Sequence, residues 1–486
     1  MKEFYLKRAE ENRPELIHEK ITPNVGAKLL KKGESAVIDL GNHYVGYFSF
    51  RMNWVEKYVD APIRLRIRFC EEERELCDDY TTYHGTLNAS WLQEEVIHVD
   101  FPEELRMPRR YAARFIKITA ELANRPFELT DFCFDAVSSG DVTALPQLKI
   151  ADPELARIDA VAVNTLKNCM QRVFEDGPKR DRRLWLGDLR LEALTNYVTF
   201  GNNALVRRCL YLFAAATDDE TGFIVSHIFD YPQVVNGRWI LEDYSIFFAS
   251  ALCDYYAATG DRETFFELYG AAKSQLDTVH STLREDGTVE ARGKCDVFID
   301  WCAGDLKKNA ALNGVYLYTL ETFAKTLHVL GHPDAEIYED RLEKGRTAAR
   351  KAFYNEEKNA VISERDGYQH SVHATVWMIL GGVIAGERAV AALEAAIADP
   401  DSLKPGTPYM HHYVLEALMR LGQKERAREY LKDFWGAMVA RGADTFYEAF
   451  VKEDPDFSPY GDRRINSLCH AWSCTPAYFI RKYFCD

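Results

Sequence analysis

The sequence predicts a multidomain, mainly α-helical protein in which an antiparallel β-sandwich precedes an (α/α)6 toroid. Three observations lead to this fold class. The chain has 486 residues, more than a single domain of ordinary size needs. Its hydrophobic pattern has a period of two in the first third and a helical period from Pro153 onward. Short turns join the helical segments, as helical hairpins require.

The period of two is clearest in the segment Ile63–Phe69, where apolar residues alternate with arginines without error. One face of this strand, carrying Ile63, Leu65, Ile67 and Phe69, should be buried. Similar runs cover residues 35–40, 44–50, 95–101, 115–120 and 127–134, with turn residues between them. We therefore expect a jelly-roll-like β-sandwich over residues 1–140 and a linker over 141–151.

The helical period predicts about twelve amphipathic helices over residues 152–486, the expected catalytic domain. They should begin near Pro153, Gly187, Asn203, Leu241, Glu263, Leu306, Ala335, His370, Glu387, His411, Lys424 and Ser467. Six hairpins of this kind would close into a toroid. Irregular segments at 172–185, 221–239, 288–304 and 440–466 hold most of the clusters of aromatic and acidic residues, and loops on a rigid scaffold commonly carry chemistry.

Composition excludes several partners. Sixty Lys and Arg face 75 Asp and Glu, for a formal charge of −15, which disfavours nucleic acid and anionic membranes. We find no apolar run long enough to span a membrane and no secretory h-region after Met1. The eleven cysteines include no C-x-x-C pair. We expect a cytoplasmic protein that binds neither nucleic acid nor membrane, and an oligomer is not excluded.

The densest group of reactive side chains lies in residues 175–188, just before an amphipathic helix. Carboxylates, arginines and a tryptophan alternate there with Pro178 and Gly187. Carboxylates bind pairs of hydroxyl groups, arginine fixes carboxylate geometry, and indole stacks on the apolar face of a sugar. A solvated, salt-bridged turn is the alternative. Pro178, Trp185 and Gly187 argue against it, so the segment predicts recognition of a polyhydroxylated ring.

The pattern Asp176-x-Pro178-x-Arg180-Asp181-x-x-x-Trp185-x-Gly187-Asp188 resembles the catalytic signature of the α-L-rhamnosidases of glycoside hydrolase family 78. The resemblance implies an inverting glycosidase on an (α/α)6 barrel. It implies that Asp181 is the general acid, that Asp176, Arg180 and Asp188 bind substrate hydroxyls, and that Trp185 belongs to the sugar site. Asp181 stands where the family usually has glutamate, so Glu175 and Glu192 remain alternative acids.

Two further segments resemble the same family. Residues 441–448 are similar to a family motif whose last glutamate, here Glu448, activates water as the general base, and Tyr447 precedes it as a binding candidate. Residues 467–473 are similar to the family's serine–histidine helix start, which implies that His470 is a sugar ligand. In the β-region, residues 38–41 and 109–115 are similar to the domain that precedes the family's barrel.

Inverting hydrolysis needs a protonated acid at the leaving oxygen and a carboxylate behind the ring, about 6.5–9.5 Å apart. Asp181 and Glu448 are 267 positions apart, so only a closed fold could bring them together. Burial or a neighbouring carboxylate such as Asp176 or Asp188 would raise the pKa of the acid. The arginines at 180 and 182 would lower it.

Further aromatic and acidic residues lie in the other irregular segments. Trp239 and Trp301 are stacking candidates, and Asp243 and Asp300 accompany them, although tryptophans also dominate protein cores. His370 and His373 lack a third ligand at a convincing spacing, so we expect no metal. No cofactor motif occurs either.

The sequence supports three hypotheses. The first is an inverting exo-glycosidase that removes terminal α-L-rhamnosyl or related residues from small glycosides or oligosaccharides. The second is an (α/α)6 hydrolase for another sugar such as an unsaturated uronide, whose carboxylate Arg182 and Arg183 could meet. The third is a carbohydrate-binding homologue without turnover, which the aspartate at 181 suggests. A fold can host many functions, so the barrel alone does not decide among them.

Overall fold

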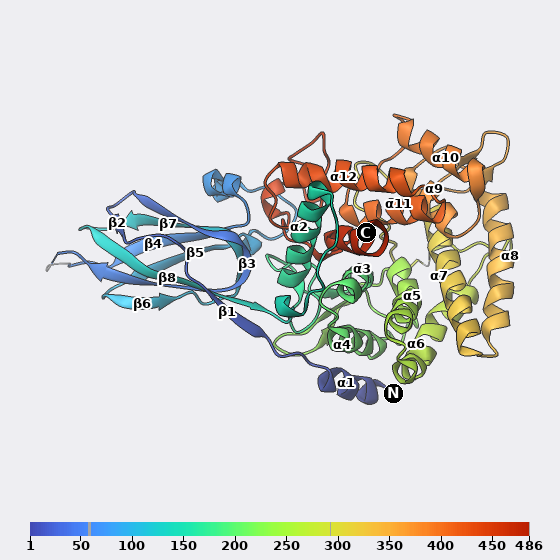
Figure 1. Cartoon of the computed structure of the whole chain (residues 1–486), viewed down its shortest axis with the longest axis horizontal. Coiled ribbons are helices and arrows are strands. Elements are labelled where there is room, and N and C mark those ends of the chain that lie inside the picture. The colour runs from blue at the N-terminus through green and yellow to red at the C-terminus, as the bar shows by residue number, and fades with distance from the viewer. Residues whose placement is uncertain (57–59, 292, 486) are drawn as a thin grey trace.

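The chain forms an N-terminal β-domain and a larger helical domain, joined end to end along the long axis of the molecule (Figure 1). This computed structural model describes residues 1–56, 60–291 and 293–485. The predicted fold class, a β-sandwich followed by an (α/α)6 toroid, is confirmed. Within the described ranges, no helix is long and apolar enough to cross a membrane.

The β-domain is one antiparallel sheet that folds over a single core. Its strands lie in the order β1-β8-β3-β7-β4-β5, with β2 on β8 and β6 on β3. The first half of β3 pairs with β7 and its second half with β8, so β3 belongs to both layers. The bounds are β1 Ile17–Ile21, β2 Lys28–Leu30, β3 Ser35–Trp54, β4 Ile63–Cys70, β5 Glu94–Val99, β6 Glu103–Arg106, β7 Tyr111–Leu122 and β8 Phe127–Ser138.

Alternation along β4 fills this core as predicted. Ile63, Leu65, Ile67 and Phe69 are each at most 1% exposed, whereas the arginines between them are partly exposed on the other face and pair with Glu94 and Glu121. The connection from β4 to β5 contains the short 3-10 helices η1 (Glu73–Cys77), η2 (Tyr80–Thr82) and η3 (Ala89–Trp91). This connection leaves the sandwich and contacts the helical domain.

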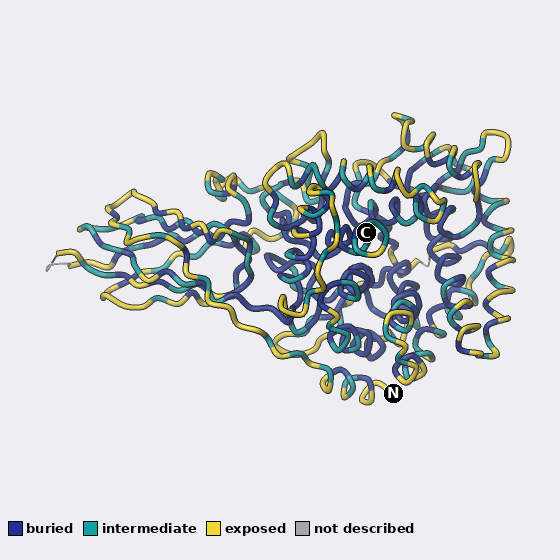
Figure 2. Tube along the Cα trace, viewed as in Figure 1, coloured by how far each residue is buried: buried dark blue, intermediate teal, exposed yellow. Residues whose placement is uncertain are grey.

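In the part of the chain that the structure describes, six outer and six inner helical segments form the toroid. The outer helices are α2 Pro153–Cys169, α4 Asn203–Ala214, α6 Arg262–His280, α8 Ala335–Phe353, α10 Gly386–Ala398 and α12 Lys424–Ala440. The inner helices are α3 Leu186–Val198, α5 Glu242–Thr259, α7 Asn309–Leu330, α9 Val372–Leu380 and α11 Pro408–Arg420. Each inner helix packs on the next, and they are buried on nearly every face (Figure 2).

The sixth inner segment differs from the predicted continuous helix from Ser467. It consists of η6 Ala471–Cys474, α13 Pro476–Phe479 and a π-turn η7 Ile480–Phe484. Pro476 occupies the first position of α13, where its missing N–H leaves no helical hydrogen bond unmade, so a new helix begins there after η6. Smaller elements are η4 Val142–Ala144, η5 Arg463–Ile465, β9 Leu184–Trp185, β10 His227–Phe229, β11 Val235–Asn236, β12 Tyr354–Asn355 and β13 Ala360–Val361.

A helix at the start of the chain, α1 Lys2–Glu11, was not anticipated within the predicted β-region. It lies apart from the sheet and packs on α4, next to α6 (Figure 1). Tyr5 is buried there against Tyr211, and Arg8 pairs with Glu267 of α6 at 2.6 Å. The first residues of the chain therefore contact the helical domain.

Candidate active site

A cavity of about 320 Å³ opens at one end of the toroid, where the loops before the inner helices meet. Its floor is charged and its walls are aromatic. Most of the residues singled out in the sequence line it: Asp176, Arg180, Asp181, Trp185, Asp188, Trp239, Trp301, Glu448 and His470. Segments far apart in the sequence thus form one site, as the closed fold requires.

Glu448 lies at the floor in a turn after α12, with 2% of its surface exposed. Arg180 forms an ion pair with one carboxylate oxygen, Oε2, which also accepts the backbone N–H of Ser467 at 3.2 Å. The Tyr460 hydroxyl donates to Oε1 at 2.6 Å. Burial opposes ionisation of Glu448, but the Arg180 charge, aided by His470 and these hydrogen bonds, lowers its pKa to about 2. Glu448 is therefore a carboxylate at neutral pH.

Asp181 lies on a strained turn at the cavity wall. Asp181 and Arg182 both have left-handed backbones, with φ of 61° and 53°. Non-glycine residues adopt this conformation rarely, and it concentrates at functional sites. The Asp181 carboxylate is 18% exposed, with Arg180 at 3.5 Å and Arg183 at 3.8 Å. It is the more accessible of the two predicted catalytic carboxyl groups.

Asp176 and Asp188 are almost fully buried beside the same cavity. Asp176 accepts the Arg183 N–H at 3.1 Å, and burial, together with the charges of Asp181 and Asp188, raises its pKa well above the usual value. Burial also raises the pKa of Asp188, although His470 lies 3.3 Å away. Carboxyl groups held in this way suit hydrogen bonding to the hydroxyls of a sugar.

Two glycines allow this close packing. A Cβ at Gly177 would lie 2.7 Å from Ser467 Oγ and 3.1 Å from His470 Nδ1, so a side chain would push the two motifs apart. A Cβ at Gly187 would collide with the Tyr244 ring at the start of α5. The contact with Ser467 thus explains why a glycine stands at position 177.

The cavity walls consist of aromatic rings. Trp185 meets Trp239 edge-on at 6.1 Å, and Trp239 is 42% exposed with its indole N–H bonded to Asp296 at 2.5 Å. On another wall Trp301 packs against Phe298 at 5.2 Å and Tyr460 at 6.1 Å. Partly exposed indoles at a polar floor are suited to stacking on a sugar ring.

Three predicted binding residues lie outside the cavity lining. Buried Asp243 accepts the N–H groups of Phe298 and Ile299 at 2.9 and 3.0 Å and so holds the loop that carries Trp301. Asp300 is bound to His373 at 2.8 Å and to the Gly406 N–H at 2.9 Å. The ring of the third, Tyr447, lines a separate cavity of about 440 Å³ with Asp444 and Arg74.

The alternative acids and one arginine also lie outside the lining. Glu175 pairs with Arg110 at 2.6 Å. Glu192 is fully buried on α3, and its carboxyl oxygens have no hydrogen-bond partner among the described residues. Burial and neighbouring carboxylates raise its pKa well above the usual value. Arg182, invoked for a uronate, donates instead to the Pro178 and Arg110 carbonyls at 2.8 and 2.6 Å.

Arg183, invoked with Arg182 for a uronate, does line the cavity. The structure also adds lining residues to which the sequence gave no role in the site: Leu87, Trp91, Leu241, Tyr244, Phe298, Tyr460 and Trp472. Trp472 lies in the segment 467–473 that resembles the family, so the sequence carried a signal for it. Leu87 and Trp91 carried none, because they come from the β4–β5 connection of the other domain. That connection reaches the site through the Thr86 N–H, which bonds the Tyr460 carbonyl at 2.9 Å.

No group of three His, Cys, Asp or Glu side chains that could hold a metal ion occurs in the described part of the chain. A cavity on an (α/α)6 toroid, with three buried carboxyl groups and one accessible carboxyl group among aromatic walls, defines a glycoside hydrolase of the six-hairpin class. Family comparisons agree. Residues 145–484 match the bacterial α-L-rhamnosidase six-hairpin glycosidase domain, and residues 11–132 match the N-terminal domain of glycosyl hydrolase family 78 α-rhamnosidases. The chain belongs to the α-L-rhamnosidases of glycoside hydrolase family 78.

Solved structures extend this result. A rhamnosidase from Klebsiella oxytoca with rhamnose bound is 37% identical, with a TM-score of 0.94 over 99% of both chains. A family 78 rhamnosidase of Bacillus sp. GL1 is 22% identical, with a TM-score of 0.79 over 98% of this chain but 48% of its own. A Streptomyces avermitilis α-L-rhamnosidase complexed with L-rhamnose is 18% identical, with a TM-score of 0.72 over 96% of this chain and 44% of its own. None of the curated proteins compared with the chain matches it.

Proposed function

We propose that the protein is an inverting exo-α-L-rhamnosidase that removes terminal α-L-rhamnosyl residues from small glycosides or oligosaccharides. Asp181 is the general acid and Glu448 the general base. The observation that carries the proposal is that both carboxyl groups line one cavity although they come from opposite ends of the helical domain. The similar Klebsiella oxytoca structure, which holds rhamnose, supports the choice of sugar.

The two carboxyl groups suit different tasks. Glu448, kept ionised by Arg180, can accept a proton from water behind the ring. Asp181 is open to the cavity and can donate to the leaving oxygen once it is protonated. Its carboxylate lies at the wall of the cavity, 3.5 Å from Arg180 and 3.8 Å from Arg183.

The other lining residues hold the sugar. Asp176, Asp188 and His470 present polar groups to its hydroxyls, and Trp185, Trp239 and Trp301 offer apolar faces. A cavity of about 320 Å³ accommodates a terminal sugar and part of its leaving group, which fits exo-action. The proposed reaction uses only these side chains and water, with no cofactor.

The test is release of an aryl group from an aryl α-L-rhamnoside by wild type, Asp181→Asn and Glu448→Gln, with proton NMR following the first anomer formed. We expect β-L-rhamnose first and rates at least about 1,000-fold lower in both variants. Asp305→Asn, at an exposed carboxylate, is the matched control and should keep full activity. An inert wild type would refute the substrate. The α-anomer as first product would refute the inverting mechanism and the role of Glu448.

A further inference from the structure

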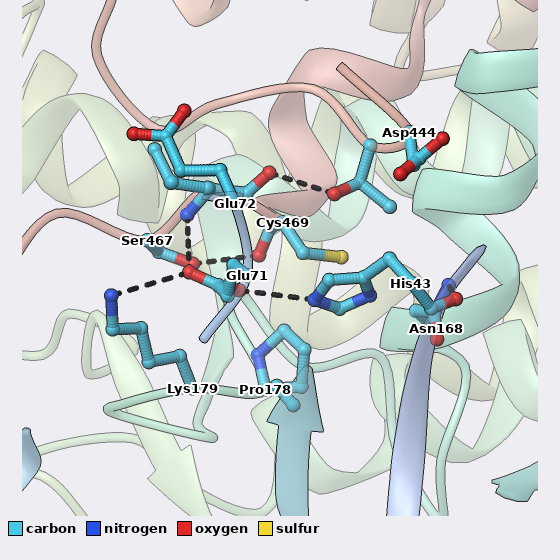
Figure 3. Close-up of polar contacts among 12 residues, drawn as sticks. His43, Glu71, Glu72, Asn168, Pro178, Lys179, Asp444, Ser467 and Cys469 are labelled. Carbon is cyan, nitrogen blue, oxygen red and sulfur yellow. Dashed lines mark hydrogen bonds and ion pairs between the residues drawn. The ribbon is translucent and has the colours of Figure 1, made fainter. Parts of the chain in front are cut away.

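Behind the cavity, the interface between the two domains contains a buried cluster of charges (Figure 3). Lys179 is 2% exposed and pairs with Glu75 at 2.6 Å and with Glu71 at 3.4 Å. Glu71 also contacts His43 Nε2 at 3.2 Å. Lys179 belongs to the helical domain, whereas Glu71, Glu75 and His43 belong to the β-domain. Charges are rarely buried at this depth unless they are paired.

The same cluster holds the backbone next to Glu448. Lys179 Nζ donates to the Asn466 carbonyl at 3.2 Å, and Glu71 Oε2 accepts the Leu468 N–H at 2.8 Å. The residue between these two anchors is Ser467, whose N–H donates to Glu448 at 3.2 Å. The segment that binds the carboxylate is therefore fixed on both sides by charges that meet across the domain interface.

Lys179 also fixes the second partner of Glu448. The next residue is Arg180, whose Nε donates to the Ile465 carbonyl at 2.9 Å while its guanidinium pairs with Glu448. Lys179 thus binds the carbonyl of Asn466, and Arg180 binds that of Ile465. The Lys179 side chain reaches the carboxylates of the β-domain, whereas the Arg180 side chain reaches Glu448 at the floor of the site.

We propose that Lys179, through its ion pairs with Glu71 and Glu75, is a positioning residue that sets the placement of Arg180 and Ser467 around Glu448. The inference rests on the proposed function in that it takes Glu448 as the base. The β-domain then supports the active site, because its carboxylates Glu71 and Glu75 hold the loop that carries the catalytic signature.

The physical reason is that Lys179 is the cation that Glu71 and Glu75 share. If Lys179 loses its charge, two buried carboxylates face each other without their shared partner. One must then become protonated or move toward water, and movement of Glu71 releases the Leu468 N–H. The 465–468 segment loses its anchors, and Glu448 loses the alignment of its two donors.

The experiment compares Lys179→Met with Lys167→Met in the full chain, on an aryl α-L-rhamnoside. Lys167 also pairs across the two domains, with Glu19 at 3.1 Å, but it touches neither catalytic segment. We expect kcat to fall about 30-fold or more in Lys179→Met with a smaller change in KM, and Lys167→Met to stay within about twofold of wild type. Lys179→Arg, which keeps the charge, should recover part of kcat.

A second readout does not depend on hydrolysis. Carboxyl-13C NMR of glutamate-labelled protein, with Glu448 assigned from the Glu448→Gln spectrum, follows the titration of Glu448 directly. In Lys179→Met we expect this carboxylate to titrate at higher pH than in wild type, because the contact with Arg180 is loosened. In Lys167→Met the titration should not change. An inert wild type would refute the proposed function, while this titration still decides the role of Lys179.

The inference is overturned if folded Lys179→Met retains both the wild-type kcat and the wild-type titration of Glu448. If Lys179→Met does not fold, Lys179→Met/Glu75→Gln removes one carboxylate together with the lysine. This double variant should fold and remain slow, since the anchor on Asn466 is still missing. Wild-type kcat in the double variant would show that the cluster serves stability alone.

Discussion

Arg180 and Glu448 form a buried ion pair in which each side chain is only 2% exposed. This pair joins the loop before α3 to the turn after α12, the two segments that carry the proposed acid and base. It also explains how a fully buried carboxyl group remains ionised, because the guanidinium outweighs the cost of burial and lowers the pKa of Glu448 to about 2.

Replacing the arginine should move the acidic limb of the pH–rate profile. In Arg180→Met the buried Glu448 loses its cation, so its pKa rises and activity is lost at a higher pH than in wild type. We also expect kcat near neutral pH to fall about 100-fold. The measurement is kcat/KM from pH 3 to 8, beside Arg388→Met, an exposed arginine of α10. An unchanged acidic limb would contradict the role of the pair.

The same pKa shift predicts a dependence of stability on pH. The pKa of Glu448 is lower in the folded than in the unfolded chain, where it is close to 4.5, so its contribution is complete above about pH 5 and is lost as the pH falls toward 2. The depression corresponds to about 3 kcal/mol. Urea unfolding between pH 6 and 3 should show a shallower loss of stability in Arg180→Met than in wild type. Parallel curves would contradict this.

The sequence could predict what depends on local pattern. The alternation of apolar residues predicted the buried face of β4, and their helical periodicity predicted the toroid. Both work because burial of one face of a strand or helix makes apolar residues recur at the period of that element. The motif residues Asp176, Arg180 and Glu448 were found through resemblance to a family. Leu87 and Trp91 could not be found, because their place in the cavity depends on how one domain packs on the other. No sequence pattern around Leu87 or Trp91 predicts how the two domains pack.

Buried Glu192 offers a test of the alternative acid. Its carboxyl oxygens have no hydrogen-bond partner among the described residues, and burial together with neighbouring carboxylates raises its pKa well above the usual value. Glutamine has the same shape as a protonated glutamate, so Glu192→Gln should retain activity within about threefold and stability within about 1 kcal/mol. Rhamnoside hydrolysis and thermal unfolding measure both. A loss as large as that of Asp181→Asn would transfer the acid role to Glu192.

Asp243 should act through the loop it holds. In Asp243→Asn the side chain accepts only one of the Phe298 and Ile299 N–H groups well, and the charge is lost. We expect about 2 kcal/mol of destabilisation and a several-fold higher KM as Trp301 shifts. Urea unfolding and kinetics test this, with Asp305→Asn as the control. A drop in kcat alone, without a change in stability, would indicate direct contact with the reacting sugar instead.

The β-domain should contribute to recognition through Trp91. This half-buried indole lines the cavity with Leu87, on a connection that is bonded to the Tyr460 segment. Trp91→Ala removes an aromatic face worth about 1 kcal/mol, so KM for an aryl α-L-rhamnoside should rise about fivefold. Phe101, 68% exposed in the same domain and outside the cavity lining, provides Phe101→Ala as the matched control.

Inhibition by free L-rhamnose shows which part of the substrate Trp91 contacts. If Trp91 contacts the leaving group, this inhibition will be the same in Trp91→Ala and in wild type. If Trp91 contacts the terminal sugar, the inhibition will weaken by a factor similar to the change in KM. Equal kinetics for the two variants would show that the β-domain adds no binding surface at this position.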